Sequence, residues 1–138
     1  MKLDLVWLEY CKIWREGRWM SRMLIADDQD GIRLMLAQVF QNLGIEVDTA
    51  NDGLSAWEKL EQNGYDLVLL DMNMPRMFGH EVLRNMRQRD IDTPVMIMTA
   101  FGEKSTLEEV QRLGITAQFE KPFDIYGMIE KVKEVLKI

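Results

Sequence analysis

Near the middle of the chain stands Leu67-Val68-Leu69-Leu70-Asp71, an acidic residue directly after four consecutive apolar residues. A short apolar run of this kind predicts a β-strand that is buried on both faces, as the strands of parallel sheets are. The acid that follows has no packing role in such a strand. It indicates instead that a polar site lies at the carboxyl end of the strand.

Short apolar runs and helical patterns alternate on both sides of this strand. Four further strands are expected at residues 23–26, 45–50, 94–98 and 117–120. Apolar residues recur at helical spacing in five segments, residues 32–43, 54–60, 82–86, 107–113 and 125–136. Because parallel strands need crossover connections, and helical crossovers cover both faces of a sheet, we expect one doubly wound α/β domain.

Polar side chains follow the apolar strands where such a domain is expected to bind its ligand. Asp27 and Asp28 follow the first strand, Asp71 ends the third, Thr99 ends the fourth and Lys121 follows the fifth. Ligands of doubly wound sheets bind beyond the carboxyl ends of the strands. Three carboxylates at one sheet edge would repel one another, and a hard cation would relieve that repulsion. Mg²⁺ is the expected cation because it prefers oxygen ligands and often shares them with phosphate.

The same residues suit phosphoryl transfer. A carboxylate can act as a nucleophile toward phosphorus, and Asp71 is the best candidate because it stands alone on the central strand. Lys121 would supply a positive charge and Thr99 a hydroxyl donor for the phosphoryl oxygens. Among the metal ligands, Asp28 is expected to bind directly, with the backbone carbonyl of Asn73 as a further ligand.

Each of these residues also has an ordinary structural explanation. Adjacent acids after an apolar run are usually solvated loop residues, and a threonine at a strand end is usually there as a β-former. What indicates a site is the joint pattern, in which polar positions end four different predicted strands in the right order.

The composition limits the classes of protein to which the chain can belong. It has 138 residues, of which 47% are hydrophobic and 29% are charged, and this is typical of one globular domain. The net charge of −6 disfavours general binding to nucleic acid. Cys11 and His80 are the only cysteine and histidine, which excludes an intrachain disulfide and a structural zinc site. We expect a reducing, cytoplasmic location and no membrane span.

Residues 1–19 differ in character from the domain expected over residues 20–138. They contain three of the four tryptophans, Trp7, Trp14 and Trp19. One interpretation is an amphipathic arm that docks on this domain or on a partner. The other is that Met20 is the natural start and that the preceding residues are upstream sequence. A signal peptide is not expected, because charged residues interrupt the apolar region.

The motifs at the strand ends are those of a known family. Residues 22–137 resemble a receiver domain of the CheY type, as found in response regulators. The matching stretches are Leu24-Ile25-Ala26-Asp27-Asp28, residues 66–75, Met98-Thr99-Ala100 and Lys121-Pro122-Phe123, with Gly79 also where the family keeps a glycine. The resemblance implies a flavodoxin-like five-stranded parallel sheet of order 2-1-3-4-5, flanked by five helices. It also implies a cis peptide bond between Lys121 and Pro122.

The resemblance further implies that Asp71 is the phospho-acceptor and that Lys121 and Thr99 contact the phosphoryl group. The implied ligands of Mg²⁺ or Mn²⁺ are Asp28, Asp71, the Asn73 carbonyl and, through a water molecule, Asp27. Such a domain accepts phosphate and is not an enzyme with an external substrate, beyond self-phosphotransfer and autodephosphorylation.

Within this family, residues 27–33 and 119–125 bear a closer likeness to the sporulation phosphorelay receivers that consist of a receiver alone. It implies that the first helix docks on a histidine-bearing helical bundle. The implied partner contacts are Gln29, Gly31, Ile32, Met35 and Phe123. Ile32 could equally be a core residue. The expected partners are a histidine kinase or histidine phosphotransferase and a downstream protein, and no attached output domain is expected after residue 138.

Two positions depart from the family pattern. Gln118 stands where many receivers carry Tyr or Phe, so a switch based on an aromatic ring is in doubt. Phe78 stands where an acid or Ser is common, and it would either narrow the mouth of the site or offer a partner an apolar contact. His80 is expected to be exposed at the start of the third helix.

Other functions fit parts of the pattern. A phosphatase of the haloacid-dehalogenase kind needs a second aspartate two residues after its nucleophile, where this chain has Asn73. A flavodoxin-like cofactor binder needs a loop rich in Ser, Thr and Gly after the first strand, and that loop is acidic here. Two alternatives stay open. One is a terminal regulator that acts by phosphorylation-dependent protein binding, and the other is an interaction module that is never phosphorylated.

Overall fold

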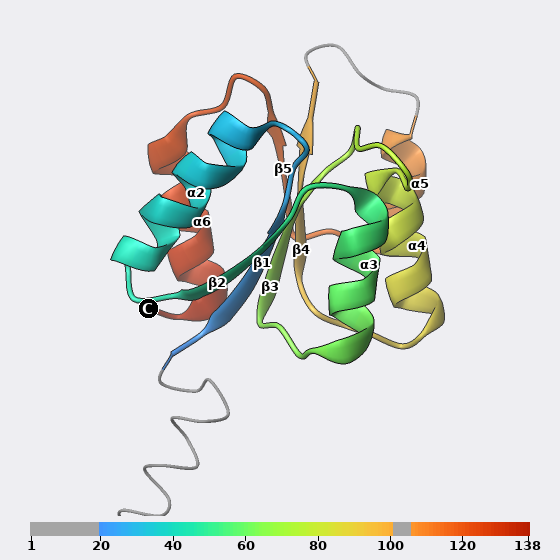
Figure 1. The fold of residues 1–138 in the computed structure, drawn as a ribbon, viewed down its shortest axis with the longest axis horizontal. Coiled ribbons are helices and arrows are strands. Elements are labelled where there is room, and N and C mark those ends of the chain that lie inside the picture. The colour runs from blue at the N-terminus through green and yellow to red at the C-terminus, as the bar shows by residue number, and fades with distance from the viewer. Residues whose placement is uncertain (1–19, 101–105) are drawn as a thin grey trace, which may run out of the picture.

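The computed structural model describes residues 20–100 and 106–138. Five parallel strands form one sheet in the order β2-β1-β3-β4-β5, with a helix between consecutive strands (Figure 1). The strands are β1 (Arg22–Ala26), β2 (Glu46–Ala50), β3 (Leu67–Asp71), β4 (Val95–Thr99) and β5 (Ala117–Glu120). The helices are α2 (Asp30–Asn42), α3 (Gly53–Gln62), α4 (Gly79–Gln88), α5 (Leu107–Leu113) and α6 (Ile125–Leu136). The predicted fold and strand order are confirmed, whereas residues 1–19, with their two interpretations, lie outside the described residues.

The central strands alternate their side chains between two apolar cores. In β1, Met23 and Ile25 belong to the core beneath α2 and α6, and Leu24 and Ala26 belong to the core beneath α3, α4 and α5 (Figure 1). Because helices cover both faces, every residue of β3 and β4 is buried. The edge strand β2 pairs only with β1 and is mostly half-buried, as its alternating sequence predicts.

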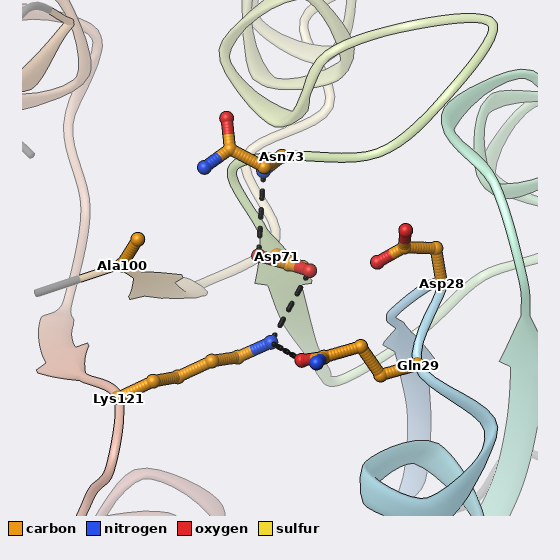
Figure 2. A pocket seen from close by; sticks show the side chains of 6 residues that line it. All are labelled: Asp28, Gln29, Asp71, Asn73, Ala100 and Lys121. Atoms are coloured by element: carbon orange, nitrogen blue, oxygen red, sulfur yellow. Dashed lines mark hydrogen bonds and ion pairs between the residues drawn. The ribbon is translucent and has the colours of Figure 1, made fainter.

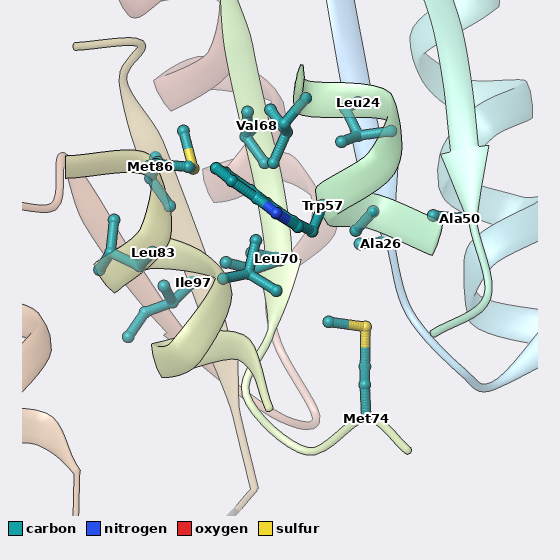
Figure 3. Close-up of a cluster of buried hydrophobic side chains, with 14 of the residues drawn as sticks. Leu24, Ala26, Ala50, Trp57, Val68, Leu70, Met74, Leu83, Met86 and Ile97 are labelled. Carbon is teal, nitrogen blue, oxygen red and sulfur yellow. The ribbon is translucent and has the colours of Figure 1, made fainter. Parts of the chain in front are cut away.

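Trp57 of α3 belongs to the core on the α3–α5 face. Figure 3 shows its indole ring among Val68, Leu70 and Met86, which come from β3 and α4. A buried tryptophan contributes a large apolar area, so this contact helps to hold α3 and α4 against β3. The strand that ends in Asp71 is therefore fixed by packing on this face.

One detail of the sequence-based prediction is wrong. His80 lies at the start of α4, as expected, but it is half-buried and not exposed. Its ring stacks on Phe78, with 5.6 Å between the ring centroids.

Within the described part of the chain, no helix is both long and apolar enough to cross a membrane.

The loops that follow β2 and β3 are in unusually close contact. Gly53 begins α3, and its N–H donates to the carbonyl oxygen of Pro75 at 3.3 Å. A Cβ atom on Gly53 would lie 1.7 Å from the carbonyl oxygen of Met77, where no real Cβ can lie. An ion pair between Arg76 and Asp52, at 3.3 Å, joins the same two loops. Residues 52–53 therefore support the loop that follows Asp71.

We expect Gly53→Ala to lower the free energy of unfolding by about 2 kcal/mol or more, because the methyl group forces two backbone segments apart. Helix propensity alone would favour alanine by about 1 kcal/mol, so the predicted sign is opposite to the local preference. Urea unfolding of the variant measures the effect. Gly64→Ala is the control, since a Cβ there meets nothing within 4 Å. Equal stability of Gly53→Ala and wild type would contradict the close contact.

Candidate functional site

The ends of four strands bring distant residues together at one edge of the sheet. Asp71 and Thr99 are the last residues of β3 and β4, and Asp27 and Lys121 follow directly after β1 and β5. The parallel register aligns these ends, and the backbone N–H of Lys121 donates to the backbone carbonyl of Thr99 at 2.8 Å. The expectation that these residues gather at one place is confirmed.

Three aspartates form an acidic cluster at this edge. Asp27 is 0% exposed and Asp71 is 4% exposed, whereas Asp28 is exposed to solvent. Each offers one carboxylate oxygen that lies within 4.8 Å of the others. Buried carboxylates this close together repel one another strongly, because the interior screens their charges poorly.

Lys121 offsets part of this repulsion. Its ammonium nitrogen lies 2.9 Å from Asp27 Oδ2 and 3.3 Å from Asp71 Oδ2. It also donates to the side-chain oxygen of Gln29 at 2.8 Å, as Figure 2 shows. Gln29 was predicted only as a partner contact, and its bond to the lysine was not expected. Nothing in the sequence indicates it, since the two residues are 92 positions apart.

The surroundings of the two charged groups shift their pKa values. Burial and the charge of Asp27 raise the pKa of Asp71 from 3.8 to about 6, although Lys121 and the backbone N–H of Asn73 oppose the rise. Burial by itself would lower the pKa of Lys121, but the hydrogen bond to Asp27 and the charges of both aspartates outweigh it and raise that pKa. The site thus holds an ionised lysine beside a carboxylate that gains a proton more readily than usual.

The raised pKa of Asp71 predicts a pH-dependent stability of the metal-free protein. An acid whose pKa is higher in the folded state binds protons more tightly there, so ionisation destabilises the fold as pH rises from about 4 to above 6. In EDTA at pH 7.5, we expect Asp71→Asn to be about 2–3 kcal/mol more stable than wild type. At pH 4 the difference should nearly vanish. Urea unfolding over this pH range measures it, and a pH-independent difference would contradict the assignment to Asp71.

A hollow of about 380 Å³ opens above the cluster (Figure 2). It is lined by Asp28, Gln29, Asp71, Asn73, Ala100 and Lys121. Thr99 lies beneath this edge and is 1% exposed, and within residues 20–100 and 106–138 its Oγ1 has no hydrogen-bond partner. A buried hydroxyl without a partner is costly, so its presence at the end of β4 indicates a ligand that would contact it. Ala100 was not predicted as a lining residue, and its small side chain leaves the hollow open.

The donor set fits a hard divalent cation such as Mg²⁺, which prefers carboxylate and carbonyl oxygens. Asp28 faces the hollow, and Figure 2 shows its carboxylate directed toward Asp71. Both oxygens of Asp27 are already bonded, Oδ1 to the Gln29 N–H and Oδ2 to Lys121. Asn73 lines the hollow, and its N–H donates to Asp71 Oδ1 at 3.3 Å. Ligation by the Asn73 carbonyl stays a prediction.

The residues predicted to contact partners lie beside this site on the α2 side. Gln29 and Gly31 are exposed, and Met35 is 42% exposed. Ile32 and Phe123 are half-buried and pack against the core beneath α2 and α6. Packing in the core therefore accounts for part of the Ile32 side chain, and a partner role for the set stays a prediction.

The two positions that depart from the family pattern are both exposed. Gln118 lies on β5, and no aromatic ring occupies that position. Phe78 does not line the hollow above Asp71, so it does not narrow that hollow. It lines a separate hollow of about 220 Å³ beside the loop after β3. The peptide bond between Lys121 and Pro122 is cis, as predicted.

Known proteins resemble this chain in both sequence and fold. Residues 23–133 match the family described as response regulator receiver domain. The chain is 42% identical over 118 residues to sporulation initiation phosphotransferase F of Bacillus subtilis, which covers 86% of this chain and 95% of that protein. It is also 40% identical over 118 residues to regulatory protein AtoC of Escherichia coli, but there it spans only 26% of the relative's length.

Solved structures agree with these matches. The receiver domain of the Francisella response regulator 1452 superposes with a TM-score of 0.78 at 31% identity, over 85% of this chain and 97% of that chain. Chemotaxis response regulator CheY4 of Vibrio cholerae superposes with a TM-score of 0.76 at 30% identity, over 84% of this chain and 98% of that chain. The chain therefore belongs to the family of response regulator receiver domains.

Proposed function

We propose that the protein accepts a phosphoryl group on Asp71 from a phosphohistidine of a partner protein and passes the signal or the phosphate to another protein. The observation that carries this proposal is the surroundings of Asp71. Its carboxylate lies in a hollow together with Lys121 and Asp28, and the unpartnered hydroxyl of Thr99 lies at the same edge. Such a set suits a reaction that depends on positioning and on neutralising phosphoryl charge.

The chemistry assigned to the chain's own residues is simple. An Asp71 oxygen forms a bond to phosphorus as the bond between phosphorus and the histidine nitrogen breaks, which leaves an acyl phosphate on Asp71 and a free histidine. Lys121 stabilises negative charge on the phosphoryl oxygens, and the Thr99 hydroxyl donates to one of them. The Asp71 carboxylate is phosphorylated and later regenerated by loss of the phosphoryl group. The domain does not turn over a separate substrate.

The acidic cluster would hold Mg²⁺ or Mn²⁺ during this reaction. Asp28 and Asp71 would bind the ion directly, Asp27 through a water molecule, and the Asn73 carbonyl would complete the protein's ligands. The bonds that already engage both oxygens of Asp27 support its indirect role. When bound, the cation neutralises charge on the carboxylates and on the phosphoryl oxygens.

A place in a phosphorelay is the finer part of the proposal. It is supported by the similarity to sporulation initiation phosphotransferase F across 95% of that protein's length. A histidine-bearing partner would dock beside the hollow, over the residues Gln29, Gly31, Ile32, Met35 and Phe123. The exposed apolar side chains of Leu34 and Met35 on α2 suit such an interface.

Incubation with acetyl phosphate and Mg²⁺, followed by intact mass measurement, tests phosphoryl acceptance. One phosphoryl group per protein is expected as the adduct, and acetate is released as the other product. EDTA should prevent formation of the adduct. Peptide mapping should place the adduct on residue 71. Absence of an adduct in the presence of Mg²⁺ would refute the proposal and favour a non-phosphorylated interaction module.

The relay role needs a separate experiment. A purified histidine phosphotransferase from the same cell should donate radiolabelled phosphate to this protein and accept it back. Transfer in the forward direction alone would refute a relay and favour a terminal regulator that acts through phosphorylation-dependent binding.

A further inference from the structure

Gln29 contacts both members of the ion pair between Asp27 and Lys121. Its backbone N–H donates to Asp27 Oδ1 at 2.8 Å, and its side-chain oxygen accepts from Lys121 Nζ at 2.8 Å. An ammonium group has only donors, so the atom of Gln29 that meets it must be the amide oxygen. Figure 2 shows this side chain reaching from the start of α2 across the hollow to the lysine.

The ammonium group of Lys121 has three hydrogen atoms, and the structure supplies three acceptors. Asp27 Oδ2 lies at 2.9 Å, Gln29 Oε1 at 2.8 Å and Asp71 Oδ2 at 3.3 Å. The longest of these contacts is the one to Asp71, whose carboxylate becomes part of an acyl phosphate in the proposed reaction. The other two contacts can therefore hold the nitrogen in place while the third hydrogen turns toward the phosphoryl group.

We propose that Gln29 is a positioning residue that holds the Lys121 ammonium over Asp71 and thereby speeds phosphoryl acceptance. This inference rests on the proposed function of Asp71. Lysine has a long, flexible side chain, and fixing its nitrogen in advance lowers the cost of orienting it during the reaction.

A neutral acceptor suits this position better than a charged one. Gln29 holds the ammonium group without cancelling its positive charge. A carboxylate in its place would add a fourth negative group near the three aspartates and would repel the incoming phosphoryl oxygens. The amide therefore holds the lysine in place without adding negative charge to the site.

The choice of phosphodonor separates this role from partner docking. Acetyl phosphate has no protein surface, so a slower reaction with it cannot result from a lost protein contact. The decisive variant is Gln29→Met, which keeps the length of the side chain and removes the acceptor oxygen. Gln88→Met is the matched control, because Gln88 is exposed at the far end of α4.

At saturating Mg²⁺, we expect Gln29→Met to react with acetyl phosphate about ten-fold more slowly than wild type, because the Lys121 nitrogen loses one of the contacts that orient it. The affinity for Mg²⁺, measured by calorimetry, and the free energy of unfolding should stay at their wild-type values. Gln88→Met should match wild type in all three measurements. A purely structural effect would move the rate, the metal affinity and the stability together.

Two results would overturn the inference. The first is a wild-type rate of Gln29→Met with acetyl phosphate, and a defect with a phosphohistidine protein alone would then make Gln29 a docking residue. The second is a parallel loss of Mg²⁺ affinity, which would reveal a distorted site. If wild-type protein accepts no phosphate at all, the proposed function fails first and the inference falls with it.

Discussion

Replacing Asp71 with asparagine is expected to abolish phosphorylation by acetyl phosphate, leaving no adduct in the intact mass. The amide has nearly the same shape as the carboxylate but lacks the charged oxygen that attacks phosphorus. Because Asp71 is buried and repelled by Asp27, the variant should remain folded and should be more stable than wild type without metal at neutral pH. A lost adduct can then be attributed to lost chemistry and not to unfolding.

Asp66→Asn is the matched control for this variant. Asp66 directly precedes β3, at the end of the strand opposite Asp71. Its carboxylate accepts a hydrogen bond from the backbone N–H of Arg22 at 2.8 Å, and the side-chain oxygen of an asparagine can accept the same bond. The control should be phosphorylated to the wild-type level. An adduct of wild-type yield in Asp71→Asn would show that another residue is the phospho-acceptor, and peptide mapping would then identify that residue.

Lys121→Met is expected to slow phosphorylation by about 100-fold, the usual cost of removing one group that stabilises developing charge in a transition state. Methionine fills similar space but carries no charge and no donor. The metal-free variant should also lose stability at neutral pH, because the cation within 2.9 Å and 3.3 Å of two buried carboxylates is gone. Stopped reactions analysed by intact mass give the rate, and urea unfolding gives the stability.

Binding of Mg²⁺ distinguishes a lost phosphoryl contact from a damaged metal site in Lys121→Met. Removal of a positive charge from the acidic cluster should leave the affinity for Mg²⁺ unchanged or increase it. Lys131→Met is the control, since Lys131 forms a surface ion pair with Glu134 on α6 at 3.5 Å. A Lys121→Met variant that reacts at the wild-type rate would show that the lysine has no part in the transfer.

The positions of the acidic residues could be predicted because they depend on local sequence. Four apolar residues before Asp71 predict a buried strand, and a buried parallel strand has a carboxyl end at a known edge of the sheet. The same reasoning applied to Asp27, Thr99 and Lys121 predicted that the residues would meet. The apolar spacing also predicted each helix that the structure describes, and α6 has the expected bounds, Ile125–Leu136, whereas α4 extends beyond the expected residues 82–86 to Gly79–Gln88.

The prediction failed or fell short where side chains or loops from separate elements meet. The contact of Gly53 with the loop after β3 depends on how two connections fold over the sheet edge, and no periodicity in the sequence reports it. His80 was predicted to be exposed, but the ring of Phe78 covers part of it. Both results depend on the directions of side chains or backbone in loops, which local propensity does not determine.

The sequence by itself determined the fold class, the strand order through its family resemblance, and the identity of the residues at the strand ends. Only the tertiary structure decided which of those residues are buried and which side chains they contact. Burial separates Asp27 from the exposed Asp28, and the reach of Lys121 across two strands brings it to Gln29. The physical reason is that strand patterns arise from neighbours along the chain, whereas hydrogen bonds and desolvation in the site arise from residues up to 94 positions apart.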